Sequence, residues 1–169
     1  MTRRTAAVAG SFYPGNNAVL QQQVESMLQQ AQGHSTAGSP PKALVVPHAG
    51  YVYSGATAAE AYRLLQGPKP PSRVILLGPA HRVYLQGLAV PSVDYFSTPL
   101  GDIPLDRPFF ERALELPGVT VSDHAHELEH SLEVKLPFLQ HVLQQFTLVP
   151  VVVGDSPAGE VAALIDTLW

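Results

Sequence analysis

Three short runs of mainly apolar residues constrain the fold of this chain more than any other feature. They are Ala43–Val46, Arg73–Leu77 and Thr147–Val153, and each one ends at a proline or a glycine. Such continuous runs are typical of strands that are buried on both faces, as in parallel sheets. Helical patterns separate them, so the sequence predicts an α/β fold: a three-layer sandwich with a mostly parallel sheet and helices on both faces.

Apolar residues recur at helical spacing between these runs. The expected helices are Asn17–Gln32, Thr57–Leu65, Arg107–Leu116, a segment from Leu132 to Phe146, and Glu160–Trp169. Ser54 is a candidate N-cap for the second helix, and Pro137 predicts a late start or a kink in the fourth. A shorter strand is expected at Leu88–Val90, and Gly33–Pro41 is a loop by its composition.

The composition narrows the classes of partner. A length of 169 residues predicts one α/β domain spanning 1–169. The net charge is −4 and the only basic run is a pair of arginines, so no nucleic-acid partner is expected. No apolar stretch is long enough to cross a membrane and no signal peptide is recognisable, which predicts a cytoplasmic location without membrane contact. Charged residues make up only 14% of the chain, against about 25% typically, which favours an exposed apolar edge and a homo-oligomer.

Two histidines follow two of the predicted strands. His48 comes one proline after the first strand, and His81 lies within the turn after the second. Because the carboxyl ends of parallel strands meet at one edge of a sheet, both imidazoles are expected at the ligand-binding edge. Two such rings on rigid turns can share a metal ion. The alternative is that each histidine only forms a hydrogen bond within its turn.

A third group of histidines lies further along the chain. The residues from His126 to His130 read HELEH, which matches the metalloprotease pattern H-E-x-x-H. In that pattern both histidines lie on one helix face and bind zinc, with Glu127 as the general base. No glycine–histidine extension follows, so a polar turn before an amphipathic helix is the alternative interpretation.

Taken together, the motifs of this sequence resemble the Memo family, protein B of the AmmeMemoRadiSam system. The motifs that carry the resemblance are AAVAGSFYP at 6–14, VPHAGY at 46–51 with YSG at 53–55, LGPAH at 77–81, EHSLE at 129–133 with LPF at 136–138, and VPVVVG at 149–154. They occur in the order of the family and cover nearly the whole chain.

The resemblance implies a fold similar to class III extradiol dioxygenases, which hold a non-haem iron at the edge of a sheet. His48 and His81 match the two pocket histidines and are the candidate metal ligands, for Fe(II) or Cu. His130 matches a histidine beside that pocket, which makes it the candidate catalytic acid or base. Phe12 matches the rim of the site and, with Tyr51 and Glu129, completes the candidate ligand-binding residues.

The family runs on past residue 169, so the sequence resembles the N-terminal part of a Memo-like unit, apparently incomplete at its C-terminus. Two histidines offer only two ligands, which predicts weak metal binding by this chain. Two functions stay open: a metal-dependent redox or dioxygenase-related oxidoreductase, and a non-catalytic module that binds a small molecule or peptide. A zinc hydrolase of the H-E-x-x-H type is a third alternative.

Overall fold

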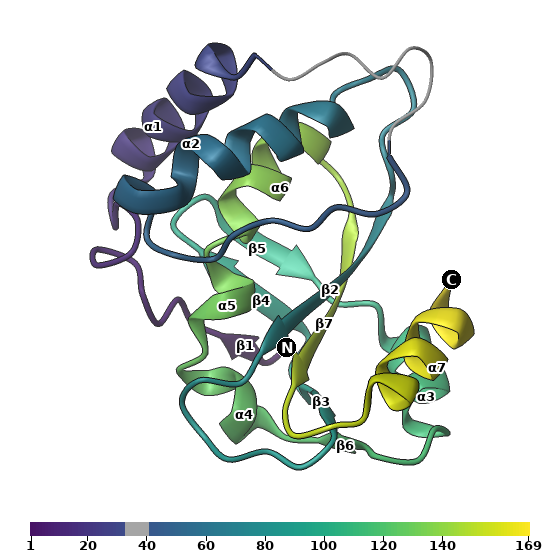
Figure 1. Cartoon of the computed structure of the whole chain (residues 1–169). Coiled ribbons are helices and arrows are strands. Elements are labelled where there is room, and N and C mark those ends of the chain that lie inside the picture. The colour runs from purple at the N-terminus through teal and green to yellow at the C-terminus, as the bar shows by residue number, and fades with distance from the viewer. Residues whose placement is uncertain (33–40) are drawn as a thin grey trace.

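The computed structural model describes residues 1–32 and 41–169, and it contains two sheets flanked by helices (Figure 1). The larger sheet has the strand order β2-β7-β3-β6, with bounds Arg73–Pro79, Thr147–Val153, Leu88–Val90 and Val119–Val121. The smaller sheet has the order β1-β4-β5, with bounds Arg3–Arg4, Tyr95–Thr98 and Gly101–Pro104. The predicted α/β fold is therefore confirmed.

The two long strands of the larger sheet lie side by side. β2 and β7 pair in parallel from Arg73 opposite Thr147 to Pro79 opposite Val153. β3 then pairs antiparallel to β7 and parallel to β6, and β5 pairs antiparallel to β4. Both sheets are thus mixed rather than purely parallel. The apolar runs correctly predicted the two long strands, of which β7 is buried along most of its length and β2 lies at the edge of the sheet.

The first predicted strand is wrong. Residues 43–46 form no strand, and Val45 is fully exposed. Among the residues that the structure describes, no strand pairs with this segment, so its apolar side chains have no sheet to enter. The predicted N-cap at Ser54 is also wrong, because the helix α2 (Tyr51–Tyr62) begins after Gly50 and Ser54 lies in its first turn.

The bounds of the remaining helices are Asn17–Gln30 (α1), Arg107–Leu114 (α3), Asp123–Glu127 (α4), His130–Glu133 (α5), Leu136–Leu143 (α6) and Ala158–Leu168 (α7), with a 3-10 turn at Arg63–Leu65. α1, α3 and α7 follow the sequence patterns, whereas α4 was not expected and the helix expected from Leu132 to Phe146 is divided into α5 and α6. Pro137 lies in the first turn of α6, which confirms the late start. The predicted loop Gly33–Pro41 lies outside the described residues except for Pro41.

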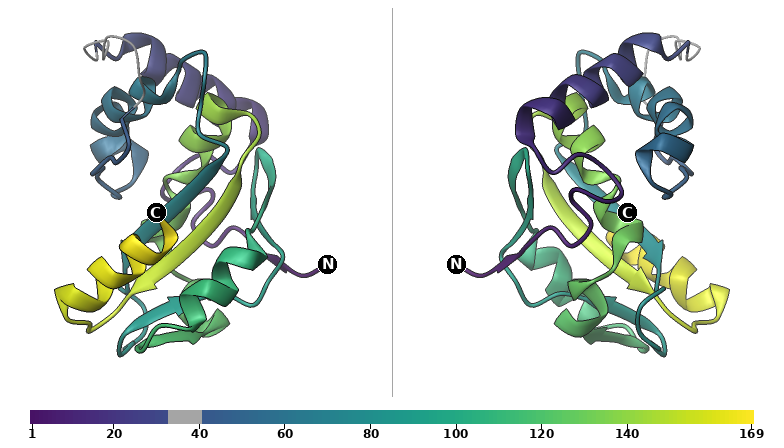
Figure 2. Two further views of the ribbon diagram at one scale, coloured as in Figure 1. Left: turned by 90° about the vertical axis from the view of Figure 1, so that its right-hand side faces the viewer. Right: turned by 90° about the vertical axis from the view of Figure 1, so that its left-hand side faces the viewer.

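The helices gather at the two ends of the β2–β7 pair. α1, α2 and α6 pack against one another near the end where these strands begin, and α3 packs against α7 towards the other end (Figure 2). No helix among the described residues is long and apolar enough to cross a membrane. The irregular chain between β2 and β3, together with the short helices α4 and α5, occupies the space at the carboxyl end of β2 (Figure 1).

A buried carboxylate joins the N-terminal segment to α5. The side chain of Glu133 is fully buried and accepts four hydrogen bonds. Its donors are the guanidinium of Arg4, the backbone N–H groups of Ala7 (2.8 Å) and Val8 (3.0 Å), and the hydroxyl of Tyr13 (2.6 Å). Since every donor comes from residues 4–13, this single side chain fixes the path of the N-terminal segment.

Arg4 completes the connection on the other side. Its guanidinium donates to the carbonyl of His126 (2.8 Å) and to that of Glu129 (2.7 Å). The first carbonyl lies in the last turn of α4 and the second just before α5, so Arg4 supplies charged donors where the two short helices meet. The buried charge of Arg4 is therefore compensated by Glu133, and the hydrogen bonds of both side chains replace the water that burial removes.

His126 is part of this core. Its ring is almost completely buried, packs edge-on against Phe96, and donates from Nε2 to the carbonyl of Ala89 (3.0 Å). Nδ1 is buried without a partner among the described residues. Burial lowers the pKa of His126 to about 4, so the ring is neutral at pH 7.

We expect Glu133→Gln to destabilise the protein strongly. The amide removes the charge that compensates Arg4 and has only one oxygen for four donors, and breaking a buried ion pair costs about 3–5 kcal/mol. Urea denaturation followed by circular dichroism measures this cost. Glu127→Gln is the matched control, because its side chain is 71% exposed and should change the free energy of unfolding by less than about 0.5 kcal/mol. Equal stability of the two variants would contradict this account.

The neutral state of His126 predicts a loss of stability in acid. Between the unfolded pKa of 6.5 and the folded pKa of about 4, the unfolded chain binds a proton that the folded chain does not. Stability therefore falls as pH falls through this window, by about 2 kcal/mol between pH 7 and pH 4.5 from this group. His126→Gln should lose that much less stability over the same range, and the exposed His124→Gln should behave like wild type. Parallel pH profiles for all three proteins would contradict the prediction.

Candidate metal centre

Three histidines from separate segments converge on one point. His48 lies in the irregular segment before α2, His81 follows the end of β2, and His130 is the first residue of α5. Their ring centroids are 5.2 Å apart for His48 and His81, 5.9 Å for His48 and His130, and 4.5 Å for His81 and His130. One nitrogen from each ring lies within 4.8 Å of the other two, which is compatible with a shared metal ion.

Backbone contacts deliver His48 to this point. Gly50 packs against the N-terminal loop, where a Cβ would lie 3.3 Å from the carbonyl oxygen of Phe12. The N–H of Tyr51 donates to that same carbonyl (2.8 Å). The absence of a side chain at Gly50 therefore lets the two segments touch. The proline before His48 restricts the backbone at the start of the turn.

Glu129 orients His81. Its carboxylate accepts the backbone N–H of His81 at Oε2 (2.6 Å) and the ring Nδ1–H of His81 at Oε1 (2.9 Å). Oε1 also accepts the N–H of Ser131 (2.8 Å). A histidine that donates from Nδ1 to a carboxylate keeps the lone pair on Nε2, which is the nitrogen free to bind a metal.

The surroundings of the site favour neutral forms of His48 and His130 near an ionised Glu129. Burial would raise the pKa of Glu129, but hydrogen bonds from Ser131 and His81 outweigh it and lower that pKa to about 2. Burial lowers the pKa of His48, and the charges of Lys135 and His81 add to the effect. Burial also lowers the pKa of His130. Neutral imidazoles are the form that binds metal ions.

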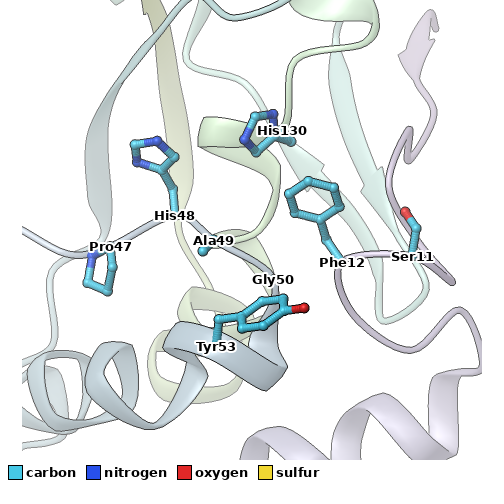
Figure 3. Close-up of a pocket in the computed structure, with 8 residues that line it drawn as sticks. All are labelled: Ser11, Phe12, Pro47, His48, Ala49, Gly50, Tyr53 and His130. Atoms are coloured by element: carbon cyan, nitrogen blue, oxygen red, sulfur yellow. The ribbon is translucent and has the colours of Figure 1, made fainter.

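A pocket of about 590 Å³ opens beside the histidines. Its lining consists of Ser11, Phe12, Pro47, His48, Ala49, Gly50, Tyr53 and His130 (Figure 3). The rings of Phe12 and His130 are 4.7 Å apart. Most of these groups are apolar or aromatic, and the two histidines supply nitrogen atoms at one side. Such a lining suits an apolar or aromatic ligand that also contacts the imidazoles.

The structure brings together most of the site residues that the sequence predicted. His48 and His81 lie close enough to share an ion, which confirms the predicted proximity, and His130 approaches the same point. Phe12 lines the pocket as expected. Glu129 does not line it, although it holds His81.

The structure does not bring Tyr51 into the pocket. Its ring is buried against Tyr13 and Phe138, and its hydroxyl donates to the carbonyl of Val134 (2.8 Å). The neighbouring aromatic residue Tyr53 lines the pocket instead. Tyr51 faces the core because it starts α2 on the side of the helix that packs inward.

The H-E-x-x-H pattern does not form the geometry of a zinc protease. α4 ends at Glu127 and α5 begins at His130, so the two histidines are not on one helix face. The ring of His126 is buried against Phe96, whereas that of His130 lies against Phe12 and His81. Only His130 belongs to the cluster.

Sequence reasoning missed two further residues near the site. Ser131 is fully buried and connects Glu129 to the end of β2 through the carbonyl of Pro79 (2.9 Å). Lys135 is 7% exposed, and burial lowers the pKa of its amine. The serine follows the histidine of EHSLE directly, which was a usable signal, whereas nothing in the pattern around Lys135 predicts its burial.

Comparison with known proteins agrees with this geometry. The family model described as "Memo-like protein" matches residues 4–167. A MEMO1 family protein of Aquifex aeolicus is 39% identical over 154 residues, covering 90% of this chain and 55% of its own length. A MEMO1 family protein of Archaeoglobus fulgidus is 39% identical over 168 residues, covering 97% and 60%. Protein MEMO1 of Mus musculus is 37% identical over 157 residues, covering 89% and 51%.

The chain spans about half the length of these curated relatives. The match nevertheless includes nearly every described element, from β1 to α7. It also includes all three histidines of the cluster, together with Glu129. On the extent of the family match and the identity to these relatives, the chain belongs to the Memo-like protein family.

Proposed function

We propose that His48, His81 and His130 together bind one transition-metal ion and that this centre serves redox chemistry on a small organic ligand. The observation that carries the proposal is the convergence of three imidazole nitrogens within 4.8 Å of one another. Sequence reasoning offered two ligands, and the structure supports a third. The complete activity of the longer relatives is part of the proposal, since this chain spans about half of their length.

The residues fit a metal ion of the first transition series. Imidazole nitrogen suits iron, copper and zinc, and three histidines can hold an ion while leaving positions free. Nδ1 of His130 is buried with no hydrogen bond among the described residues, although it lies 3.3 Å from Oε1 of Glu129. The donor set lacks the carboxylate of a two-histidine, one-carboxylate iron site, because the oxygens of Glu129 already accept hydrogen bonds. Because three imidazoles suit either metal, we propose Fe(II) or Cu as the bound ion.

The remaining residues prepare the site for a ligand. Glu129 keeps His81 in the tautomer with a free Nε2. Phe12, Pro47 and Tyr53 provide the apolar side of the pocket. A metal ion bound by the histidines would supply a Lewis acid or a one-electron couple next to this surface. His48 and His130 both line the pocket, and we propose His130, whose ring also lies against Phe12, as the one that exchanges a proton with a bound ligand.

A second function is favoured by the pocket itself. Its lining is mostly apolar and open on one side, which suits a small molecule or a peptide side chain without any turnover. Metal content after anaerobic reconstitution separates the two functions. One iron or copper per chain supports the redox proposal, and a metal-free protein that still binds ligands supports the binding module.

Alanine variants of the three histidines should weaken metal binding. Titration calorimetry with Zn(II), Cu(II) and anaerobic Fe(II) should show one ion per wild-type chain. Each of His48→Ala, His81→Ala and His130→Ala should lower the affinity at least about tenfold, since each removes one of few ligands. His124→Ala is the control, because its side chain is 80% exposed outside the cluster.

The same titrations assign His130. If His130→Ala binds metal as tightly as wild type, His130 is not a ligand, and its role returns to that of acid or base. Loss of binding in His124→Ala, or no binding by wild type, would contradict the proposed centre.

Glu129→Gln should weaken metal binding without removing a ligand. The amide oxygen cannot replace both carboxylate oxygens that hold His81, and loss of such a partner typically costs 10–100-fold in metal affinity. The affinity is measured by the same titration at pH 7.5, with the folded fraction checked by circular dichroism. Glu127→Gln should bind like wild type. Unchanged affinity in Glu129→Gln would show that His81 holds its orientation without the carboxylate.

A further inference from the structure

The end of β2 and the start of α5 touch at a position where neither has room for another atom. A Cβ built on Gly78 would lie 2.5 Å from Oγ of Ser131, 3.0 Å from Cβ of Ser131 and 2.8 Å from Cδ2 of Leu132. Contacts under 3.0 Å essentially never occur for real Cβ atoms. The contact lies between two members of the cluster, since Gly78 is three residues before His81 and Ser131 directly follows His130.

Ser131 also forms two hydrogen bonds at this contact, one to β2 and one to the N-cap residue of α5. Its hydroxyl donates to the carbonyl of Pro79 (2.9 Å), which belongs to β2. Its backbone N–H donates to Oε1 of Glu129 (2.8 Å), the same oxygen that accepts the ring of His81 (2.9 Å). Ser131 is fully buried, so both bonds are protected from water.

We propose that Gly78 and Ser131 are positioning residues that set the separation between His81 and His130. The metal-binding part of this inference rests on the proposed function, whereas the positioning part rests on the contact alone. His130 and Ser131 are the first two residues of a helix of only four residues. Such a short helix has little internal stability of its own, so its position depends on what it packs against.

A side chain at position 78 would therefore displace α5 as a unit. His130 would move away from His81, whose ring centroid now lies 4.5 Å away. Glu129 is the N-cap residue of α5 and would move with it, which would break the bond to Nδ1 of His81. Both the spacing of the ligands and the tautomer of His81 depend on the same contact.

The test uses Gly78→Ala and the double variant Gly78→Ala/Ser131→Gly. The double variant removes two of the three close contacts but also the hydrogen bond to Pro79, so it should restore only part of what the single variant loses. Long-range ¹H–¹⁵N spectra of the metal-free protein report the tautomer of His81, and a cross-relaxation peak between ring protons reports the proximity of His81 and His130. Zn(II) titration gives the affinity of the same samples.

We expect Gly78→Ala to lose the Nδ1–H signature of His81 and the peak between the two rings, and to bind Zn(II) at least about tenfold more weakly. The double variant should recover both in part, with values between those of Gly78→Ala and the wild-type protein. Val24→Ala is the control for a general loss of stability, because Val24 is fully buried in α1 and distant in sequence from every site residue. It should keep the wild-type spectra and affinity at temperatures where it is folded.

The outcomes are distinct. Wild-type spectra in Gly78→Ala, or equal losses in Val24→Ala, would overturn the inference. If Gly78→Ala does not fold, Ser131→Ala decides the question, because it removes the bond to Pro79 without adding an atom; an unchanged tautomer and affinity there would overturn the inference as well. If the wild-type protein binds no metal, the proposed function fails, while the spectra of the metal-free variants still test the positioning role.

Discussion

The buried carboxylate of Glu133 is the interaction on which the rest of this structure depends. Its four donors all belong to the first 13 residues, a segment with little regular structure of its own. Once that segment is fixed, the carbonyl of Phe12 meets the backbone at the start of α2, and the ring of Phe12 meets His130. The position of Phe12 in the pocket therefore depends on the hydrogen bonds that the N-terminal segment donates to Glu133.

Two buried glutamates at the two ends of α5, Glu129 and Glu133, have different roles. Glu133 faces the N-terminal segment and only stabilises the fold. Glu129 faces the end of β2 and orients His81. Both are almost completely buried, and burial of a carboxylate is costly unless hydrogen bonds replace its water. The backbone N–H groups and the tyrosine, arginine and histidine donors provide that replacement. The candidate metal ligands are thus held in place by buried carboxylates whose hydrogen bonds are all formed within the protein.

The sequence predicted the two long strands of the larger sheet and most helices because their patterns reflect burial directly. β7 is apolar on both faces, and α6 begins where Pro137 requires it. The same reasoning failed for residues 43–46, since an apolar run specifies burial only when a partner strand is available. The smaller sheet was missed because β1, β4 and β5 are two to four residues long and partly polar. Among site residues, the strand-end rule found His48 and His81, the family resemblance indicated that His130 lies beside them, and tertiary packing buries His126 away from the cluster.

The three candidate donors are not held equally. His81 is bonded to a buried carboxylate and His130 belongs to α5, but His48 lies in an irregular segment, and its ring has no hydrogen bond among the described residues. The first two donors form a prepared half-site, and the third is brought in by its backbone. An ion bound there would be held by His81 and His130, with His48 as the least constrained of its three donors. Release of a bound ion would accordingly depend most on His48, the donor with the fewest contacts, which also lines the neighbouring pocket.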